Sequence, residues 1–234
     1  TLFRSVNEYR TTYEKMVTST TANYTGTFDK HTVGTMVGFE AEKNKTDYVR
    51  ATGSNLAVST IHTVSTAGTQ TSAGYSWGNS MVSVLSKLDY NYDERYFISG
   101  SYRRDGSSAF SYTGNQWQNF YSVGLGWLMS EEAWMKDITW LDMLKLKGSW
   151  GTLGNQNLDR AYPAEPLLTN AYSAVFGTPS AIYPGYQLAY LPNPKLRWEK
   201  VEAWEAGAEA NFLRNRLHFE GVYYKKKTKD LLAE

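Results

Sequence analysis

The sequence predicts an all-β protein whose strands form an antiparallel, up-and-down sheet. The chain of 234 residues contains 18 Tyr and 8 Trp beside only 6 Pro, and aromatic and β-branched residues favour strands. Apolar and polar residues alternate along most of the chain, which is typical of strands with one apolar and one polar face. Short and long connections also alternate. This order places every long connection at the same end of the sheet.

About nine strands are visible by this alternation. The clearest segments are residues 20–28, 32–43, 80–92, 95–104, 120–129, 144–150, 200–213 and 216–228. Several exceed the roughly five to six residues of strands in globular sheets and approach the ~9 to 11 residues that cross a bilayer at a tilt. Strand length therefore favours a sheet that spans a membrane.

The period of two assigns side chains to two faces. On the apolar face we expect Val84, Val123, Leu125, Leu146, Trp204, Ala206, Ala208, Ala210 and Phe212. On the polar face we expect Ser122, Lys145, Lys147, Glu205, Glu209 and Asn211. In a transmembrane barrel the first set would meet lipid and the second set would line the lumen.

The connections differ in length. Hairpin turns are predicted at Asp29-Lys30-His31, Asp93-Glu94 and Arg214-Asn215, because so few residues separate the strands there. Long connections are predicted at residues 44–79, 105–116 and 152–199. Residues 130–140 are predicted as a short helix capped by Ser130, with two acidic residues in the first turn, where the helix dipole favours negative charge.

The stretch RYFISGSYRRDGSSAF, residues 95–110, indicates where one strand ends. Tyr96, Ile98 and Tyr102 share a face, and the charged run that begins at Arg103 predicts a solvated loop. Aromatic residues also mark other strand ends, at Tyr90, Tyr92, Trp127, Trp134, Tyr223 and Tyr224. Such rings lie in lipid while their polar atoms meet the headgroups. We therefore expect this strand to leave the membrane at Tyr102.

A soluble fold is the alternative at this point. A β-sandwich that binds glycans or proteins also alternates apolar and polar residues, because each of its sheets has one buried and one wet face. Strand length, the alternation of short and long connections and the aromatic strand ends favour a partial transmembrane β-barrel over this module.

Composition argues against several functions. The chain has 24 basic and 23 acidic residues, so no overall field attracts nucleic acid. Without cysteine it has no disulfide framework, thiolate metal site or cysteine nucleophile. His31, His62 and His218 are too scattered for a metal site, and a wet polar face explains Glu205 and Glu209 more simply than hydrolysis does. We predict neither enzyme activity nor a cofactor.

Five segments together resemble one family. They are YRRDGSSAF, SVGLGWLMSEEAWMKD, WLDMLKLKGSWGTLGNQ, NPKLRWEKVE and NRLHFEGVYYKKKTKDLL, in this order. The series resembles the later barrel region of SusC/RagA-type TonB-dependent transporters of the Bacteroidetes outer membrane. The resemblance extends from about residue 20 to the end of the sequence.

The resemblance implies active, TonB-dependent import of a nutrient, an oligosaccharide or a peptide, by a multi-pass protein of the bacterial outer membrane. It implies a barrel of about 22 strands, a plug domain, a TonB box that contacts the inner-membrane motor, a SusD-like surface lipoprotein and surrounding outer-membrane lipid. By this resemblance we expect residues 1–234 to contain none of the plug, the TonB box or the family's final strands. We therefore expect them to be one part of the barrel domain of a longer transporter.

Two segments are candidate contact sites. The connection 152–199 contains the aromatic residues Tyr162, Tyr172, Tyr183, Tyr186, Tyr190 and Trp198. Exposed rings of this kind stack on sugars or contact a protein partner, and the alternative is that they pack the long loop onto itself. The basic run KKKTKD, residues 225–230, either binds lipopolysaccharide phosphate or is a solvated strand exit.

Overall fold

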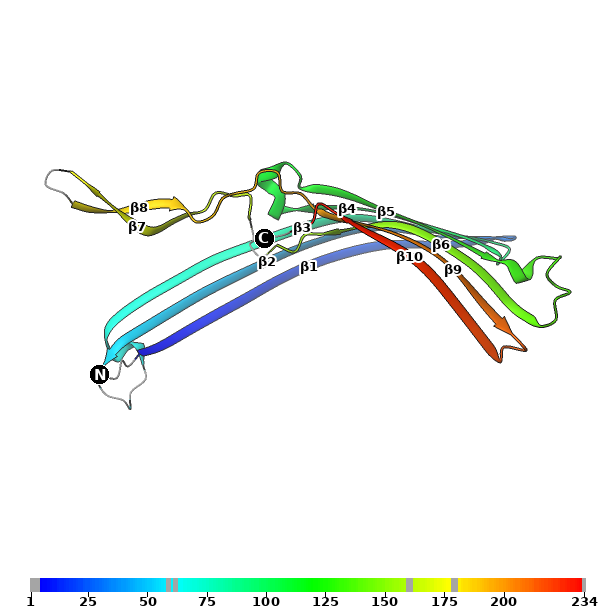
Figure 1. Ribbon diagram of the computed structural model, residues 1–234, viewed down its shortest axis with the longest axis horizontal. Coiled ribbons are helices and arrows are strands. Elements are labelled where there is room, and N and C mark those ends of the chain that lie inside the picture. Colours follow the sequence, from blue (N-terminus) through cyan, green and yellow to red (C-terminus); the bar gives the residue numbers. More distant parts are fainter. Residues whose placement is uncertain (1–4, 58–59, 61–62, 159–161, 178–180, 233–234) are drawn as a thin grey trace. The chain divides into compact units, whose positions relative to one another are not determined.

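A computed structural model describes residues 5–57, 60, 63–158, 162–177 and 181–232 (Figure 1). Almost all of its regular secondary structure is β-strand. The strands are β1 Ser5–Phe28, β2 His31–Leu56, β3 Ala67–Tyr92, β4 Tyr96–Ser107, β5 Trp117–Leu128, β6 Leu141–Asn155, β7 Leu168–Phe176, β8 Ala181–Leu188, β9 Glu199–Phe212 and β10 Leu217–Lys229. Three 3₁₀ helices lie between them: η1 Val64–Thr66, η2 Ser108–Thr113 and η3 Met129–Glu131. Over the residues that are described, no helix is long and apolar enough to cross a membrane.

Eight strands form one sheet in the order β1-β2-β3-β4-β5-β6-β9-β10, and β7 pairs with β8 in a separate hairpin. Neighbouring strands of this sheet follow one another in the chain, apart from β6 and β9, between which the β7–β8 hairpin is inserted. Their pairing is antiparallel. The predicted all-β, antiparallel, up-and-down fold is confirmed, with ten strands in the described part of the chain where about nine were expected.

The three short hairpin turns are confirmed. Residues with positive φ occur at Asp29, at Asp93 and Glu94, and from Leu213 to Asn215, with values between 53° and 60°. Tight turns between antiparallel strands need this left-handed backbone, which Asp and Asn tolerate better than most residues.

Contacts divide the chain into two units, residues 1–18 with 41–81 and residues 19–40 with 82–234. The first unit is a ribbon built from the parts of β1, β2 and β3 that lie farthest from their hairpin turns. Cross-strand pairs stabilise it: Lys15 Nζ lies 2.9 Å from Glu42 Oε2, Asn44 Nδ2 donates to Asn79 Oδ1 at 3.0 Å, and the rings of Tyr48 and Tyr75 stack at 4.9 Å.

This ribbon corrects the prediction of a loop at 44–79. Strands β2 and β3 have 26 residues each, and only 57–66 connect them. The segment was misjudged because it is rich in Gly, Ser, Thr and Asn, which are common in loops. Its glycines instead allow close strand pairing: a Cβ at Gly78 would lie 2.5 Å from the Asn44 carbonyl oxygen.

Two further predictions need correction. Strand β4 continues to Ser107, so the run after Tyr102 is not a loop; Arg103 Nε donates to Asp105 Oδ1 at 2.7 Å, which neutralises this charge within the sheet. The predicted helix 130–140 is only the short η3 turn, and the residue before it, Leu128, makes no side-chain cap. Long connections remain at 108–116 and 156–198, the latter containing β7 and β8.

Candidate functional site

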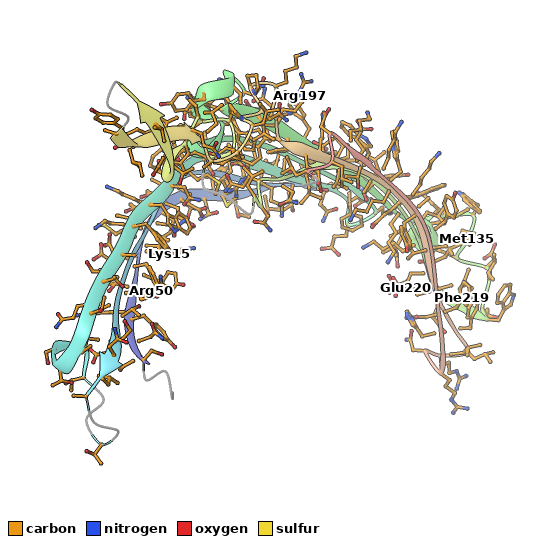
Figure 2. All side chains as sticks on the ribbon, turned by 60° about the vertical axis from the view of Figure 1, so that its left-hand side comes forward. Lys15, Arg50, Met135, Arg197, Phe219 and Glu220 are labelled. Atoms are coloured by element: carbon orange, nitrogen blue, oxygen red, sulfur yellow. The ribbon has the colours of Figure 1, made fainter. Side chains whose placement is uncertain are left out.

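The sheet has one apolar and one polar face. Residues paired directly across antiparallel strands share a face, so the register places Ile98, Leu125, Gly148, Ala206 and Tyr223 in one row across β4, β5, β6, β9 and β10. We call the face with this row the apolar face and the opposite one the polar face. Figure 2 shows the alternation directly, since the consecutive residues Phe219 and Glu220 of β10 project to opposite sides of the ribbon.

The face assignments made from the sequence hold in this register. Leu125 is 59% exposed on the apolar face, whereas Ser122, on the polar face, shares a 2.6 Å hydrogen bond with Ser101 of β4. Trp150 and Trp204 are a cross-strand pair with ring centres 5.8 Å apart, so they lie on the same face. The exposed apolar face has the character of a surface that meets lipid.

Lys147 on the polar face reaches across a neighbouring strand. Its Nζ lies 3.8 Å from Glu209 of β9 and forms an ion pair with Glu220 of β10. The side chain passes over Gly207, where a Cβ would lie 3.2 Å from Lys147 Cε. The absence of a side chain at Gly207 therefore makes room for this contact.

Lys145, two residues earlier on the same face, extends in the opposite direction. Its Nζ lies 4.8 Å from the centre of the Phe97 ring on β4, a cation–π arrangement. It passes Gly126 of β5, where a Cβ would lie 3.6 Å from Lys145 Cε. Glycines on the polar face thus let both lysines lie along the sheet.

A second charged cluster surrounds Arg103. Its guanidinium contacts the Asp105 carboxylate, donates to Ser83 Oγ at 3.0 Å and lies 3.7 Å from Glu40 Oε1. Ser83 is fully buried and Asp105 is 7% exposed. The cluster connects β2, β3 and β4, and it explains why a charged run can remain in a regular strand.

The polar face of the second unit contains a groove of about 780 Å³. Its lining includes the charged residues Asp89, Lys145, Lys147, Glu205 and Glu220, together with small residues such as Gly34, Ser99 and Gly124. Small residues keep the groove open, and mixed charges keep it wet.

Aromatic rings form a belt on the apolar face near the short turns. The ring centres of His31 and Tyr92 are 4.9 Å apart, those of Tyr92 and Tyr96 6.2 Å, and those of Tyr96 and Trp127 6.4 Å. Glu132, in the turn after η3, accepts hydrogen bonds from the Tyr96 hydroxyl and from Trp127 Nε1. The Tyr96 hydrogen bond, followed by that of Trp127, lowers the pKa of Glu132.

Three of the six aromatic residues predicted as contacts anchor the long connection. Trp198 is 4% exposed, packs against Phe110 and Phe120, and donates from Nε1 to the Gln116 carbonyl at 3.2 Å. The Tyr190 hydroxyl donates at 2.8 Å to the carbonyl oxygens of Tyr162 and Glu165.

Residues other than the six predicted aromatic ones also hold the long connection in place. The Tyr162 hydroxyl lies 3.3 Å from Ser108 Oγ. A hydrogen bond to Glu165 raises the pKa of the Tyr112 hydroxyl. Sequence reasoning missed these partners in η2, because nothing in the spacing links residues about 50 positions apart.

The other three aromatic residues lie on the β7–β8 hairpin. Tyr183 is 52% exposed and Tyr186 is 69% exposed, both on β8. Tyr172 is on β7, where its backbone is paired with Gly185. The hairpin therefore presents at least two aromatic side chains to solvent, at the end of the sheet opposite the short turns.

The described residues hold no cluster of three or more potential metal ligands. His31 is engaged with the Tyr90 hydroxyl at 2.7 Å, and His218 with Asn211 Oδ1 at 2.6 Å. His62 lies outside the described residues. The two histidines that are described thus take part in hydrogen bonds within the sheet.

Alternating strand faces, an aromatic belt and connections of unequal length at the two ends define an outer-membrane β-barrel protein. A family model described as TonB dependent receptor-like, beta-barrel, matches residues 2–234, and the chain belongs to this family. It is of the SusC/RagA type, which excludes the soluble sandwich considered above.

Relatives and solved structures agree with this assignment. The chain is 37% identical over 161 residues to the TonB-dependent receptor SusC of Bacteroides thetaiotaomicron, covering 68% of this chain and 16% of SusC. It is 30% identical over 217 residues to the TonB-dependent receptor P39 of Formosa agariphila, covering 90% of this chain and 20% of P39. Both relatives are TonB-dependent receptors.

The solved structures include that of the RagAB peptide transporter, with a TM-score of 0.80 and 25% identity, covering 98% of this chain and 25% of that chain. The "closed-closed" state of the RagAB peptide importer gives a TM-score of 0.81 and 26% identity. This chain thus spans a quarter or less of the length of these proteins.

Proposed function

We propose that residues 1–234 form part of the barrel domain of an active importer that carries a nutrient across the bacterial outer membrane. The observation that most supports this is the separation of an exposed apolar face, with Leu125 and Leu146, from a polar face with Lys145, Lys147 and the groove. In a closed barrel the apolar face meets lipid and the polar face encloses a wet lumen. The strands would cross the membrane many times.

The energy source and the partners follow from the family. Members of TonB-dependent systems are driven by an inner-membrane motor, and we propose that TonB acts on this protein through a plug region elsewhere in the polypeptide. We further propose a SusD-like surface lipoprotein as the partner at the outer mouth. The exposed Tyr183 and Tyr186 of the β7–β8 hairpin support this idea, because aromatic side chains are enriched at protein interfaces.

The cargo is proposed as an oligosaccharide or a peptide. Solved structures similar to this chain belong to a peptide transporter. Exposed tyrosines can stack on sugar rings as well as contact a peptide. Import assays with labelled oligosaccharides and labelled peptides, in cells with and without a protonophore, separate these two classes.

The membrane assignment has a direct test in the full-length protein. Fluorescent reporters at Leu125 and Leu146 should be quenched by a short-range quencher in the acyl chains, because both lie on the apolar face. Reporters at Ser122 and Lys145 should not be quenched, although these residues are close in sequence to Leu125 and Leu146. Equal quenching on both faces, or none on either, would remove the barrel orientation and the transport function that depends on it.

A further inference from the structure

The apolar face changes character along β9 and β10. From the short turn outwards, β10 places Phe219, Gly221 and Tyr223 on this face, followed by Lys225, Lys227 and Lys229. Their paired residues on β9 are Ala210, Ala208, Ala206, Trp204, Glu202 and Lys200. The surface therefore passes from apolar to aromatic to basic within one sheet face.

We call Lys200, Lys225, Lys227 and Lys229 the basic band. It contains four lysines against one carboxylate, Glu202, on the same face. Lys229 Nζ lies 2.8 Å from Glu202 Oε2, with 43% of the lysine side chain exposed. Within the described residues the other three lysines form no ion pair, so the band has an excess of positive charge.

The basic band lies next to exposed aromatic rings. Trp204 is 58% exposed and Tyr223 is 74% exposed, and both precede the lysines on their strands in the direction away from the β9–β10 turn. Aromatic rings at the edge of an apolar belt mark the headgroup level, and lysines just beyond them extend into the phosphate layer. The order of residues thus matches the order of layers in a lipid leaflet.

The same order recurs on β4. Gly100 and Lys225 lie in one row of paired residues, through Val123, Trp150 and Trp204. Tyr102 and Arg104 follow on the same face of β4 at increasing distance from the short turns, and Arg104 lies 5.0 Å from the Trp117 ring centre. A cation at Arg104 is therefore four residues beyond this row, as Lys229 is on β10.

We propose that the basic band binds the phosphate groups of a phosphorylated glycolipid, lipopolysaccharide, in the outer leaflet. The proposal rests on the proposed function, which places the long-connection end of the sheet outside the cell. Charge complementarity supports this occupant, since phosphates at a lipid surface attract nearby lysines. The adjoining apolar belt would contact the acyl chains of the same molecule, which a free anion lacks.

The test uses the full-length protein and purified lipid A, with binding measured by titration in native mass spectrometry. Replacing Lys225, Lys227 and Lys229 together by Gln should weaken lipid A binding at least about tenfold, because each lysine near anionic headgroups contributes. Lys226→Gln is the matched control: Lys226 is paired with Ala203 on the polar face, and its loss should leave binding unchanged. Heat-modifiable gel migration verifies that each variant is folded.

A gain of binding provides a second arm that misfolding cannot mimic. Glu202→Gln removes the one carboxylate that competes for Lys229, so lipid A should bind more tightly. Dephosphorylated lipid A should bind weakly to every form. Displacement of lipid A by millimolar inorganic phosphate, or equal binding by the triple variant and the Lys226→Gln control, would overturn the proposal.

These outcomes are distinct from failure of the proposed function. If the reporters at Leu125 and Ser122 show that the apolar face does not meet lipid, both ideas fall. If quenching follows the expected pattern but the triple lysine variant binds lipid A as the wild type does, the importer proposal holds and only the lipid site is wrong.

Discussion

Lys147 of β6 forms an ion pair with Glu220 of β10, although β9 lies between these two strands. The contact is possible because Gly207 of β9 leaves the path open, and Glu209 of β9 lies 3.8 Å from the same ammonium group. The polar face of the sheet is thus linked over three strands by one side chain. The ion pair requires both the spacing of the charged residues and a glycine at position 207.

Gly207→Val should destabilise the barrel more than Gly148→Val does. A Cβ at Gly207 would lie 3.0 Å from the Gly221 carbonyl oxygen and 3.2 Å from Lys147 Cε, whereas at Gly148 the nearest atom would be 3.7 Å away. The urea midpoint of the heat-modifiable band of the full-length protein measures this difference. Equal midpoints would show that the space above Gly207 is not needed.

Leu125→Arg should lower the folded fraction far more than Ser122→Arg. A cation on the lipid face costs up to about 2 to 4 kcal/mol at the bilayer midplane and less toward the interfaces, while a lumen position is wet. Leu125 is 59% exposed on the apolar face, and Ser122 is hydrogen-bonded to Ser101 on the polar face. Folding into vesicles, followed by a gel-shift assay, measures the folded fraction of each variant. A similar loss of folded protein in both variants would contradict the assigned faces.

Gly78→Ala should loosen the ribbon formed by β1, β2 and β3. Its new Cβ would lie 2.5 Å from the Asn44 carbonyl oxygen, a clash with backbone that only a shift of the strands relieves. Gly34→Ala is the control, since its nearest contact would be 3.8 Å away. Limited proteolysis should cut the Gly78 variant within 44–79 faster than the control or the wild type. Equally rapid cleavage of all three proteins would indicate that residues 44–79 are a loop.

The turn after η3 should show pH dependence through Glu132. Hydrogen bonds from Tyr96 and Trp127 lower the pKa of this carboxyl in the folded state. Because the folded pKa lies below the unfolded one, the contribution is present above the unfolded pKa and is lost as pH falls through the folded pKa. Glu132→Gln should flatten the acid limb of the thermal midpoint measured against pH. An unchanged acid limb in this variant would mean that the carboxylate adds nothing.

Removing the β7–β8 hairpin should leave the barrel intact and impair docking of the surface partner or import. Residues 168–188 can be replaced by a short linker because Ala189 N already donates to Leu167 O at 2.8 Å. Trp198→Ala is the contrasting change: this ring is 4% exposed, and truncating a buried Trp costs about 3 to 5 kcal/mol. Loss of the folded band on hairpin removal would show that the hairpin is structural.

Alternation by itself determined much of this protein. It assigns Leu125 and Ser122, and likewise Leu146 and Lys145, to opposite faces of the sheet without knowledge of the strand pairing, because successive side chains of a strand point to opposite faces. The hairpin turns were equally local, since Asp93 and Glu94 leave no other way to connect two strands. Local geometry therefore predicted the sheet, its turns and its faces.

The tertiary structure decided what depends on residues distant in sequence. Residues 44–56 and 67–79 became strand because β1, β2 and β3 supply one another with backbone hydrogen bonds, which composition does not reveal. Trp198 became an anchor because Phe110 and Phe120 enclose it, while Tyr186 stayed exposed in the same connection. Whether a side chain contacts solvent, lipid or another ring depends on residues that only the folded chain brings near it. The period and the composition of the sequence do not give the distance between such residues.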